Sequence, residues 1–257
     1  MSDPPISLAA ACEPDPWAGL KAFTAARIAL GRSGTSVPLR EALAFRLAHA
    51  HARDAVYSAL ATEQLLSDLQ ALPVNVCQAH SRATTRQEYL QRPDWGRQLD
   101  EASHALLVGQ ATGECDVVVV LADGLSATAI NDHGLPLLRL LLPQLHQAGL
   151  RLAPVVLAEQ ARVALGDEIG QLLQARLSLV LIGERPGLSS PNSLGAYFTF
   201  GPRPGLTDEA RNCVSNIRPE GLTYPAAAAK LFFLIQEAFR LQLSGVQLKD
   251  QSDLLQA

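Results

Sequence analysis

Three short apolar runs in the second half of the chain constrain its fold more than any other feature. They are Val117–Leu121 (VVVVL), Val155–Leu157 and Leu177–Ile182 (LSLVLI), and a helical pattern follows each of the first two. Continuous aliphatic runs of this length are typical of strands that are buried on both faces. Strands that alternate with helices over short connections form right-handed βαβ units around a parallel sheet. The sequence therefore predicts an α/β fold with a Rossmann-like, mostly parallel sheet and flanking helices.

Weaker patterns indicate how the rest of the chain is organised. Apolar residues recur at three- and four-residue spacing over 17–30, and a second such stretch runs from Pro38 to about Asp68, so both are expected to be helices. We expect a flexible, proline-rich tail over residues 1–16, a helical N-terminal domain over 17–72 and a Rossmann-like domain over 73–257. Within the last domain, further strands are expected near 73–81 and 197–200, and further helices near 100–108, 127–150, 160–175 and 225–243.

The composition argues against several classes of function. The formal net charge is −4, so the chain has no global positive field that would attract nucleic acid. Its four cysteines are far apart, and no Cys/His spacing of the zinc-binding kind occurs, so no metal site is expected. Scattered thiols are typical of a reducing cytosol. Neither a signal peptide nor a membrane-spanning run is recognisable. We therefore expect a cytoplasmic protein that binds neither nucleic acid nor a membrane.

The sequence contains no self-sufficient set of catalytic residues. Neither G-x-G-x-x-G nor the P-loop pattern is present, which argues against dinucleotide and nucleoside-triphosphate sites. The first strong strand leads into Gly124-Leu125-Ser126-Ala127-Thr128, which is close to the G-x-S-x-G elbow of α/β-hydrolases. That family needs a histidine well downstream, whereas only His133 and His146 follow Ser126. We expect Ser126 to cap the next helix, and a serine hydrolase that uses Ser126 is kept as an alternative.

Charged side chains gather at two places where a ligand or a partner could bind. The strand at Leu177–Ile182 ends in the loop Gly183–Gly187 (GERPG), which places a carboxylate and a guanidinium beyond a buried strand. In open α/β sheets, ligands bind beyond the carboxyl ends of the strands. The most basic stretch is 82–97, which carries Arg82, Arg86, Arg92 and Arg97. It is either a solvated surface or an interface to an acidic partner.

Several motifs, in order along the chain, resemble the small (light) subunit of ethanolamine ammonia-lyase, an adenosylcobalamin-dependent enzyme. The two most specific are GERPGL at 183–188 and RNCVSNIR at 211–218. The others are ARIALGR at 26–32, LAHAHARDAV at 47–56, YLQRPD at 89–94 with GR at 96–97, and DGLS at 123–126. The resemblance extends over all but about the first fifteen residues.

This resemblance implies a hetero-oligomer, with six copies of each subunit, in which a barrel-shaped large subunit holds the substrate. Adenosylcobalamin would lie between the two subunits and keep its own dimethylbenzimidazole on cobalt, in agreement with the absence of a D-x-H-x-x-G motif. In the family, homolysis of the Co–C bond gives an adenosyl radical that abstracts hydrogen from ethanolamine. Migration and loss of ammonia then leave acetaldehyde. Because the cofactor carries this chemistry, the small subunit is expected to be inactive alone.

Carried over position by position, the family's cobalamin contacts correspond to Val163, Glu184 and Cys213. The resemblance implies an apolar or backbone contact at Val163, a carboxylate that accepts from a corrin amide at Glu184, and a backbone or packing contact at Cys213. No catalytic residue and no metal ligand is expected on this chain. Residues 73–257 then become a cobalamin-binding domain. The N-terminal helices and the segment 82–97 become candidates for the subunit interface.

Two further expectations concern the role and the location of the chain. The alternative to a cobalamin-binding subunit within the same complex is a structural partner subunit that makes no contact with the ligand. Some members of the family carry a longer N-terminal tail, whose amphipathic helix directs them to bacterial microcompartments. The proline-rich tail of this chain offers no such helix. We therefore expect residence in the cytoplasm rather than in a microcompartment.

Overall fold

Four of the expected apolar segments pair as a parallel sheet in the structure, a computed structural model that describes residues 15–111 and 113–251. They are β1 (Val76–His80), β2 (Cys115–Ala122), β3 (Val155–Glu159) and β4 (Ala175–Gly183). Their order in the sheet is β1-β3-β2-β4. All eight residues of β2 are buried, as expected for an apolar strand between two neighbours. The tail expected at residues 1–16 lies, apart from its last two residues, outside the described range.

Two antiparallel strands extend the sheet beyond β4. β5 (Leu194–Phe200) contains the segment expected at 197–200, and β6 (Arg211–Ile217) pairs with β5 at the edge. The sequence did not predict β6, which follows a short 3-10 helix at Asp208–Ala210. The α/β class and the flanking helices are confirmed. The sheet is mixed, because the last two of its five strand pairings are antiparallel.

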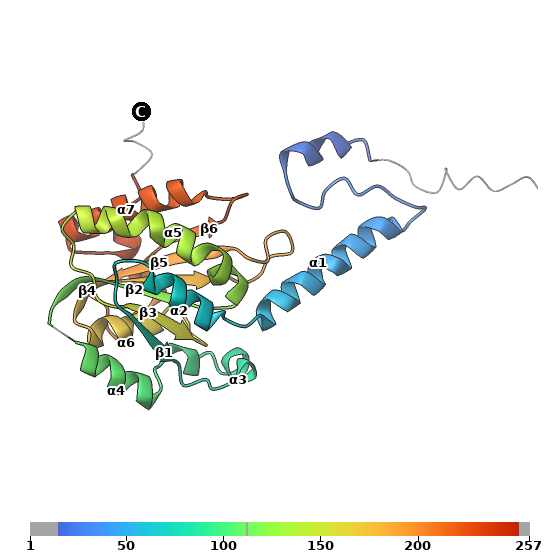
Figure 1. Cartoon of the computed structure of the whole chain (residues 1–257). Helices are drawn as coiled ribbons and strands as arrows, with labels where there is room; N and C mark the ends of the chain where they lie inside the picture. The colour runs from blue at the N-terminus through green and yellow to red at the C-terminus, as the bar shows by residue number, and fades with distance from the viewer. Residues whose placement is uncertain (1–14, 112, 252–257) are drawn as a thin grey trace, which may run out of the picture.

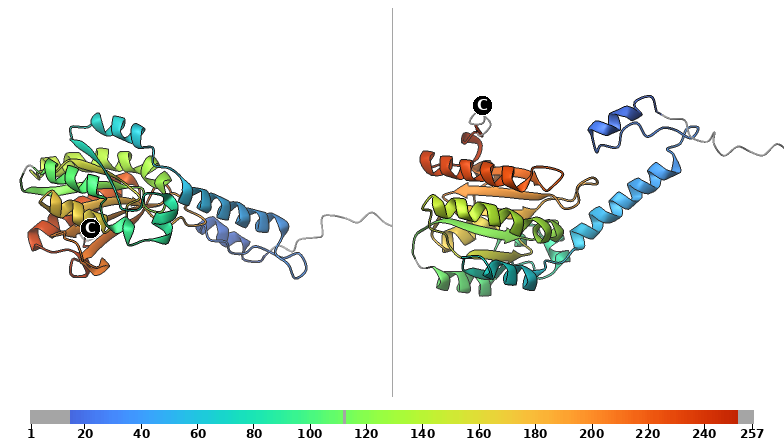
Figure 2. Two further views of the ribbon diagram at one scale, coloured as in Figure 1. Left: turned by 90° about the horizontal axis from the view of Figure 1, so that it is seen from below. Right: turned by 45° about the horizontal axis from the view of Figure 1, so that its top comes forward.

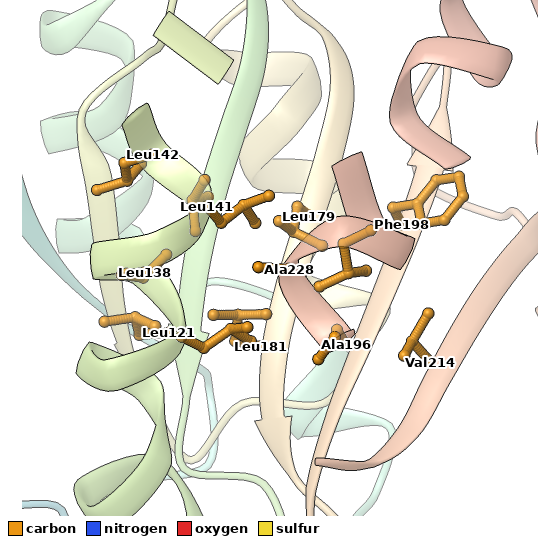
Figure 3. Close-up of a cluster of buried hydrophobic side chains, with 14 of the residues drawn as sticks. Leu121, Leu138, Leu141, Leu142, Leu179, Leu181, Ala196, Phe198, Val214 and Ala228 are labelled. Atoms are coloured by element: carbon orange, nitrogen blue, oxygen red, sulfur yellow. The ribbon is translucent and has the colours of Figure 1, made fainter. Parts of the chain in front are cut away.

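One layer of helices packs on each face of the sheet (Figure 1). On one face lie α2 (Thr62–Gln70), α5 (Ala127–Gln147) and α7 (Tyr224–Leu241), and on the other lie α4 (Glu101–Gln110) and α6 (Leu165–Leu172). Since side chains alternate along a strand, Val119 of β2 enters the α5-side core and Val120 enters the α6-side core. Figure 3 shows the α5-side core, where leucines of α5 and β4 pack beside Phe198 and Val214. Burial of each such side chain stabilises the fold by about 1.5–3 kcal/mol.

Most helices of the sheet domain lie where the sequence predicted them. α7 begins one residue before Pro225, where a proline ring fits the first turn. The helix expected at 160–175 is shorter, because α6 starts only at Leu165 and leaves 160–164 as a loop. The remaining short elements are η2 (Ala18–Phe23), α3 (Arg86–Gln91), η3 (Trp95–Arg97), η4 (Asp208–Ala210) and η5 (Gly245–Gln247). Within the described ranges, no helix combines the length and the apolar character needed to cross a membrane.

The N-terminal region differs from the two long helices that the sequence predicted. Residues 17–30 form only the 3-10 helix η2 and an irregular segment, and the second helix is divided into α1 (Leu39–Tyr57) and α2 by a break at 58–61. The break separates two environments: α2 buries Leu65 and Leu69 against the sheet, whereas Ala55 is the only fully buried residue described on α1. Figures 1 and 2 show α1 and η2 projecting from the sheet as an arm. The domain boundary at residue 72 stays a prediction.

Candidate functional site

The loops that follow β2 and β3 are tied together by one buried carboxylate. Asp123, the first residue after β2, accepts backbone N–H groups from Gly124 at 2.9 Å, from Gln160 at 2.9 Å and from Ala161 at 3.0 Å. The guanidinium of Arg86 lies 3.6 Å away. Burial raises the pKa of the Asp123 carboxyl, and the three N–H groups and Arg86 act against this by favouring the charged form. Asp123 therefore holds the carboxyl ends of two neighbouring strands in a defined arrangement.

The loop that carries Val163 is fastened to α3. Val163 lies two residues before α6 and is half-buried against the α6-side core. Its neighbour Arg162 donates to the carbonyl oxygen of Tyr89 at 3.2 Å, and its guanidinium carbon lies 4.1 Å from the centre of the Tyr89 ring. The ring of Tyr89 is itself fully buried. Val163 is therefore presented by an anchored loop rather than by the helix that the sequence predicted.

Glu184 is the first residue beyond β4, and its side chain is held by two donors. The hydroxyl of Ser193 donates to Glu184 Oε2, and the backbone N–H of Asn216 lies 3.3 Å from the same oxygen. Within the described residues, no donor in the chain is bound to the other oxygen, Oε1. The backbone N–H of Glu184 also donates to the carbonyl of Ser193 at 3.0 Å. The carboxylate is therefore fixed in position while one oxygen stays available as an acceptor.

Cys213 is exposed on β6 and lies opposite Tyr197 of β5. The two residues are direct partners in the antiparallel register. Partial burial raises the pKa of the Cys213 thiol, the Glu184 charge raises it further, and an interaction with Tyr197 lowers it. Because the net effect is a raised pKa, the thiol is protonated at neutral pH and is a poor nucleophile. Cys213 is therefore suited to a packing contact.

The structure brings two of the three predicted contact residues together and leaves the third on a neighbouring loop. Glu184 and Tyr197 line an open hollow of about 440 Å³, together with Arg185, Gly187, Ser190, Ser193, Ser215 and Asn216. Cys213 is not among the lining residues, but it lies beside the hollow because it pairs with Tyr197. Val163 belongs to the loop after β3, which is separated from β4 by β2. The two loops therefore leave the same edge of the sheet from strands that are not adjacent. All three residues lie on the α6 side or at the carboxyl edge of the sheet.

Sequence reasoning missed Tyr197, Ser193 and Asn216 as members of this group. Asn216 adopts a left-handed backbone conformation with φ of 58°, close to a shift in the β5–β6 register. Such bulges bend a strand and re-aim its groups, often beside functional sites. Here the bulge turns the N–H of Asn216 toward Glu184. The asparagine in the motif SNIR could have indicated a left-handed residue, but the partner strand had to be known first.

Ser126 lies at the N-cap position of α5, as predicted, but it is not placed as a nucleophile. The residue is fully buried, and its hydroxyl donates to the carbonyl oxygen of Pro191 at 3.0 Å instead of capping the helix. The ring of His133 hydrogen-bonds to the Tyr224 hydroxyl at 2.8 Å, not to Ser126. A serine nucleophile needs an exposed hydroxyl and an adjacent base. The hydrolase alternative therefore has no support in this geometry.

The basic stretch 82–97 divides into inward and outward arginines. Arg86 turns inward, donating to the carbonyl oxygens of Val56 and Gly124 at 2.7 and 2.8 Å. Arg82 and Arg97 are exposed and line a second cavity of about 900 Å³ between α4, α6 and the segment 204–207. Arg86 is therefore a structural residue, while Arg82 and Arg97 remain interface candidates. In residues 15–111 and 113–251, no group of three His, Cys, Asp or Glu side chains is placed to hold a metal ion.

Comparison with known proteins yields consistent matches over nearly the whole chain. Residues 14–249 match the family model described as ethanolamine ammonia-lyase light chain (EutC). The chain is 54% identical over 243 residues to the ethanolamine ammonia-lyase small subunit of Pseudomonas paraeruginosa, covering 93% of this chain and 89% of that protein. The proteins of the same name from Pseudomonas fluorescens and Ralstonia nicotianae are 51% identical over 258 residues and 50% identical over 257 residues. These two alignments each cover 99% of this chain and cover 92% and 95% of the respective relatives.

Proposed function

Because the chain belongs to the family of ethanolamine ammonia-lyase small subunits, we propose that it helps to bind adenosylcobalamin at an interface with the large subunit. The complex would convert ethanolamine to acetaldehyde and ammonia by radical chemistry. We propose Val163, Glu184 and Cys213 as the cofactor contacts on this chain. The observation that carries this proposal is the free Oε1 of Glu184, held beside an open hollow at the carboxyl edge of the sheet. Ligands of open α/β folds bind at this edge.

The residues present suit a corrinoid that keeps its own lower base. Its amide-bearing rim needs acceptors, and Glu184 Oε1 is an acceptor whose direction is set by Ser193 and Asn216. Its apolar faces need apolar walls, and half-buried Val163 offers one. The thiol of Cys213, whose pKa is raised, stays neutral and can pack without carrying charge to the ligand. These groups bind and orient a large amide-rich molecule, and none of them acts as an acid or a base.

The chemistry and the binding are then divided between cofactor and protein. When bound, adenosylcobalamin supplies an adenosyl radical through homolysis of its cobalt–carbon bond. The part of this chain is to hold one side of the ligand through Glu184 and Val163, and to exclude water there. Because the hollow is open to solvent on this chain, the other side of the ligand would be covered by a second subunit. This division supports the expectation that the chain is inactive alone.

The N-terminal arm supports the proposal of a large-subunit partner. Of the fourteen exposed large hydrophobic side chains among the described residues, nine lie between residues 17 and 57. Monomeric proteins seldom leave such a concentration exposed, and it commonly marks an interface. The same segment, counted from residue 15, carries six Lys and Arg against three Asp and Glu, although the whole chain has a net charge of −4. We therefore propose that the arm packs on an apolar surface of the large subunit that is rimmed by acidic residues. By family resemblance, six copies of each subunit would assemble.

Co-expression with a large subunit tests the proposal directly. The purified complex should bind adenosylcobalamin and deaminate ethanolamine, whereas either subunit alone should do neither. Glu184→Ala should weaken cobalamin binding by about tenfold, which corresponds to about 1.4 kcal/mol for one charged hydrogen bond. Glu114→Ala, at the exposed amino end of β2, is the matched control and should bind normally.

Two outcomes would count against parts of the proposal. A folded complex that binds no cobalamin would refute the proposed function. A complex that binds cobalamin equally well with Glu184→Ala and with Val163→Trp would favour the structural partner subunit without ligand contact. For the arm, Leu47→Asp should prevent co-purification of the two subunits, while Leu140→Asp, at another exposed leucine that lies on α5, should not.

A further inference from the structure

We propose that the ring of Tyr197 is a fourth cofactor-binding surface, which contacts an apolar part of adenosylcobalamin between Glu184 and Cys213. This inference rests on the proposed function and adds a residue that neither the sequence motifs nor the family resemblance indicated. Tyr197 lies in the middle of β5, with Val180 of β4 on one side and Cys213 of β6 on the other. Tyr197 therefore lies between Glu184 and Cys213, two of the proposed cofactor contacts.

Tyr197 differs from the other large side chains of its strand. Leu194 and Phe198 point to the α5 side and are fully buried. Tyr197 points to the opposite face, packs at the margin of the α6-side core and is only half-buried. α6 packs against β4, whereas Cys213 and Ser215 of β6 are exposed on the same face. The sheet thus leaves its aromatic side chain uncovered beside the hollow rather than beneath a helix.

A glycine next to Tyr197 brings the ring and the Glu184 carboxylate together. A Cβ atom added at Gly195 would lie 3.0 Å from Tyr197 Cε2, 3.0 Å from Glu184 Cγ and 3.1 Å from Glu184 Oε1. The side chains of Tyr197 and Glu184 therefore occupy the space that a side chain at residue 195 would fill. This arrangement places the Tyr197 ring beside the Glu184 carboxylate.

Binding pockets for cofactors combine aromatic walls with a few oriented polar groups. The ring of Tyr197 supplies such a wall, and Glu184 Oε1 supplies the acceptor at its border. A tyrosine ring offers a large rigid contact area at little entropic cost. A macrocycle whose rim carries amides and whose faces are apolar matches both groups at once. Cys213 lies directly opposite Tyr197 in the antiparallel register, so the ring stands between the two proposed contacts.

Cobalamin affinity of the reconstituted complex tests this role, measured by equilibrium dialysis with adenosylcobalamin. Tyr197→Phe keeps the ring and should bind within about twofold of the unaltered complex. Tyr197→Ser and Tyr197→Gln remove the ring and should each weaken binding by about tenfold or more, as is usual for a buried aromatic contact. Gly195→Ala keeps the Tyr197 ring but pushes it and the Glu184 side chain apart, and it should weaken binding by about fivefold, which is about 1 kcal/mol.

Two matched controls separate a ligand contact from a structural role. Tyr224→Ser removes another half-buried tyrosine, which belongs to the opposite face of the sheet. Gly109→Ala adds a methyl group where nothing lies within 4 Å. Both should leave cobalamin affinity unchanged. Thermal melting and gel filtration of each complex show whether it is folded and assembled, so that weaker binding is scored only for intact complexes.

The outcomes distinguish this inference from the proposed function. If the unaltered complex binds no adenosylcobalamin, the proposed function fails. If it binds normally and intact Tyr197→Ser and Tyr197→Gln complexes bind equally well, Tyr197 is only a structural residue and the inference is overturned. If Tyr197→Phe loses as much affinity as Tyr197→Ser, the hydroxyl rather than the ring makes the contact, and the inference as stated is wrong.

Discussion

The buried ion pair between Arg211 and Asp167 predicts a large and testable cost of removing one partner. The guanidinium Nη1 lies 2.7 Å from Asp167 Oδ1, and the two side chains are only 3% and 2% exposed. Arg211 also donates to Thr199 at 3.1 Å and to the carbonyl oxygen of Leu206 at 3.0 Å. The pair joins β6, two residues before Cys213, to the first turn of α6, four residues after Val163. It therefore couples the two elements that present these proposed contacts.

The expected magnitude follows from burial. Removing one partner of a buried pair leaves an uncompensated charge and costs about 3–5 kcal/mol. Burial raises the pKa of the Asp167 carboxyl, while Arg211 lowers it. In Arg211→Met the acid would therefore take up a proton, which limits the loss of stability to the lower end of this range, about 3 kcal/mol. For a chain of this size, each kcal/mol lowers Tm by about 2–4 °C. Arg211→Met should therefore lower the Tm of the complex by about 6–12 °C.

A double-mutant cycle measures whether the cost comes from the unpaired charge. Arg211→Met combined with Asp167→Leu removes both charges and should recover most of the lost stability, because buried pairs can be replaced by apolar residues at little cost. Arg240→Met breaks an exposed pair with Glu237 and should leave Tm unchanged. If Arg211→Met melted like the unaltered complex, or if the double variant were no better than the single one, the reasoning from buried charge would be refuted.

Three further predictions rest on other parts of the structure. Gly183→Ala should severely destabilise the protein and displace the Glu184 loop, because a Cβ there would lie 2.7 Å from the Asp123 carbonyl oxygen. Chemical denaturation would show the loss of stability. An unchanged denaturation midpoint would contradict the close approach of the Gly183 and Asp123 backbones. Burial lowers the pKa of His133, so the unfolded chain takes up this proton at a higher pH than the folded one, and stability should fall as the pH drops below about 6.5. Denaturation midpoints at two pH values should show a smaller drop for His133→Asn, and an equal drop would rule out His133 as the cause. The raised pKa of Cys213 predicts slow alkylation by iodoacetamide at pH 7 and faster alkylation at pH 9, and bound cobalamin should protect the thiol. Mass spectrometry of the labelled peptide would measure the alkylation. Rapid labelling at pH 7 would contradict the raised pKa.

The parallel part of the fold was predictable because its signals are local. β2 and β4 are continuous aliphatic runs, and strands buried on both faces leave this pattern in any sequence. β6 carries no such run: among Arg211–Ile217, buried and exposed residues are mixed. Its strand character comes from pairing with β5, which is a long-range contact. In the N-terminal region, the helical spacing of 17–30 was outweighed because none of these residues is buried, and isolated helices of this length are marginal in water.

The candidate site divides in the same way. The motifs GERPGL and RNCVSNIR, and the family they indicate, could be read from the sequence alone, as could the loop after β4 in which Glu184 lies. The loop that carries Val163 was predicted as part of a helix. The tertiary structure alone decided that Tyr197 stands between Glu184 and Cys213, and that Asn216 turns its N–H to the Glu184 carboxylate. The physical reason is that antiparallel register and a bulge create these neighbours. Both depend on which strand pairs with which, and no local pattern of side chains encodes that pairing.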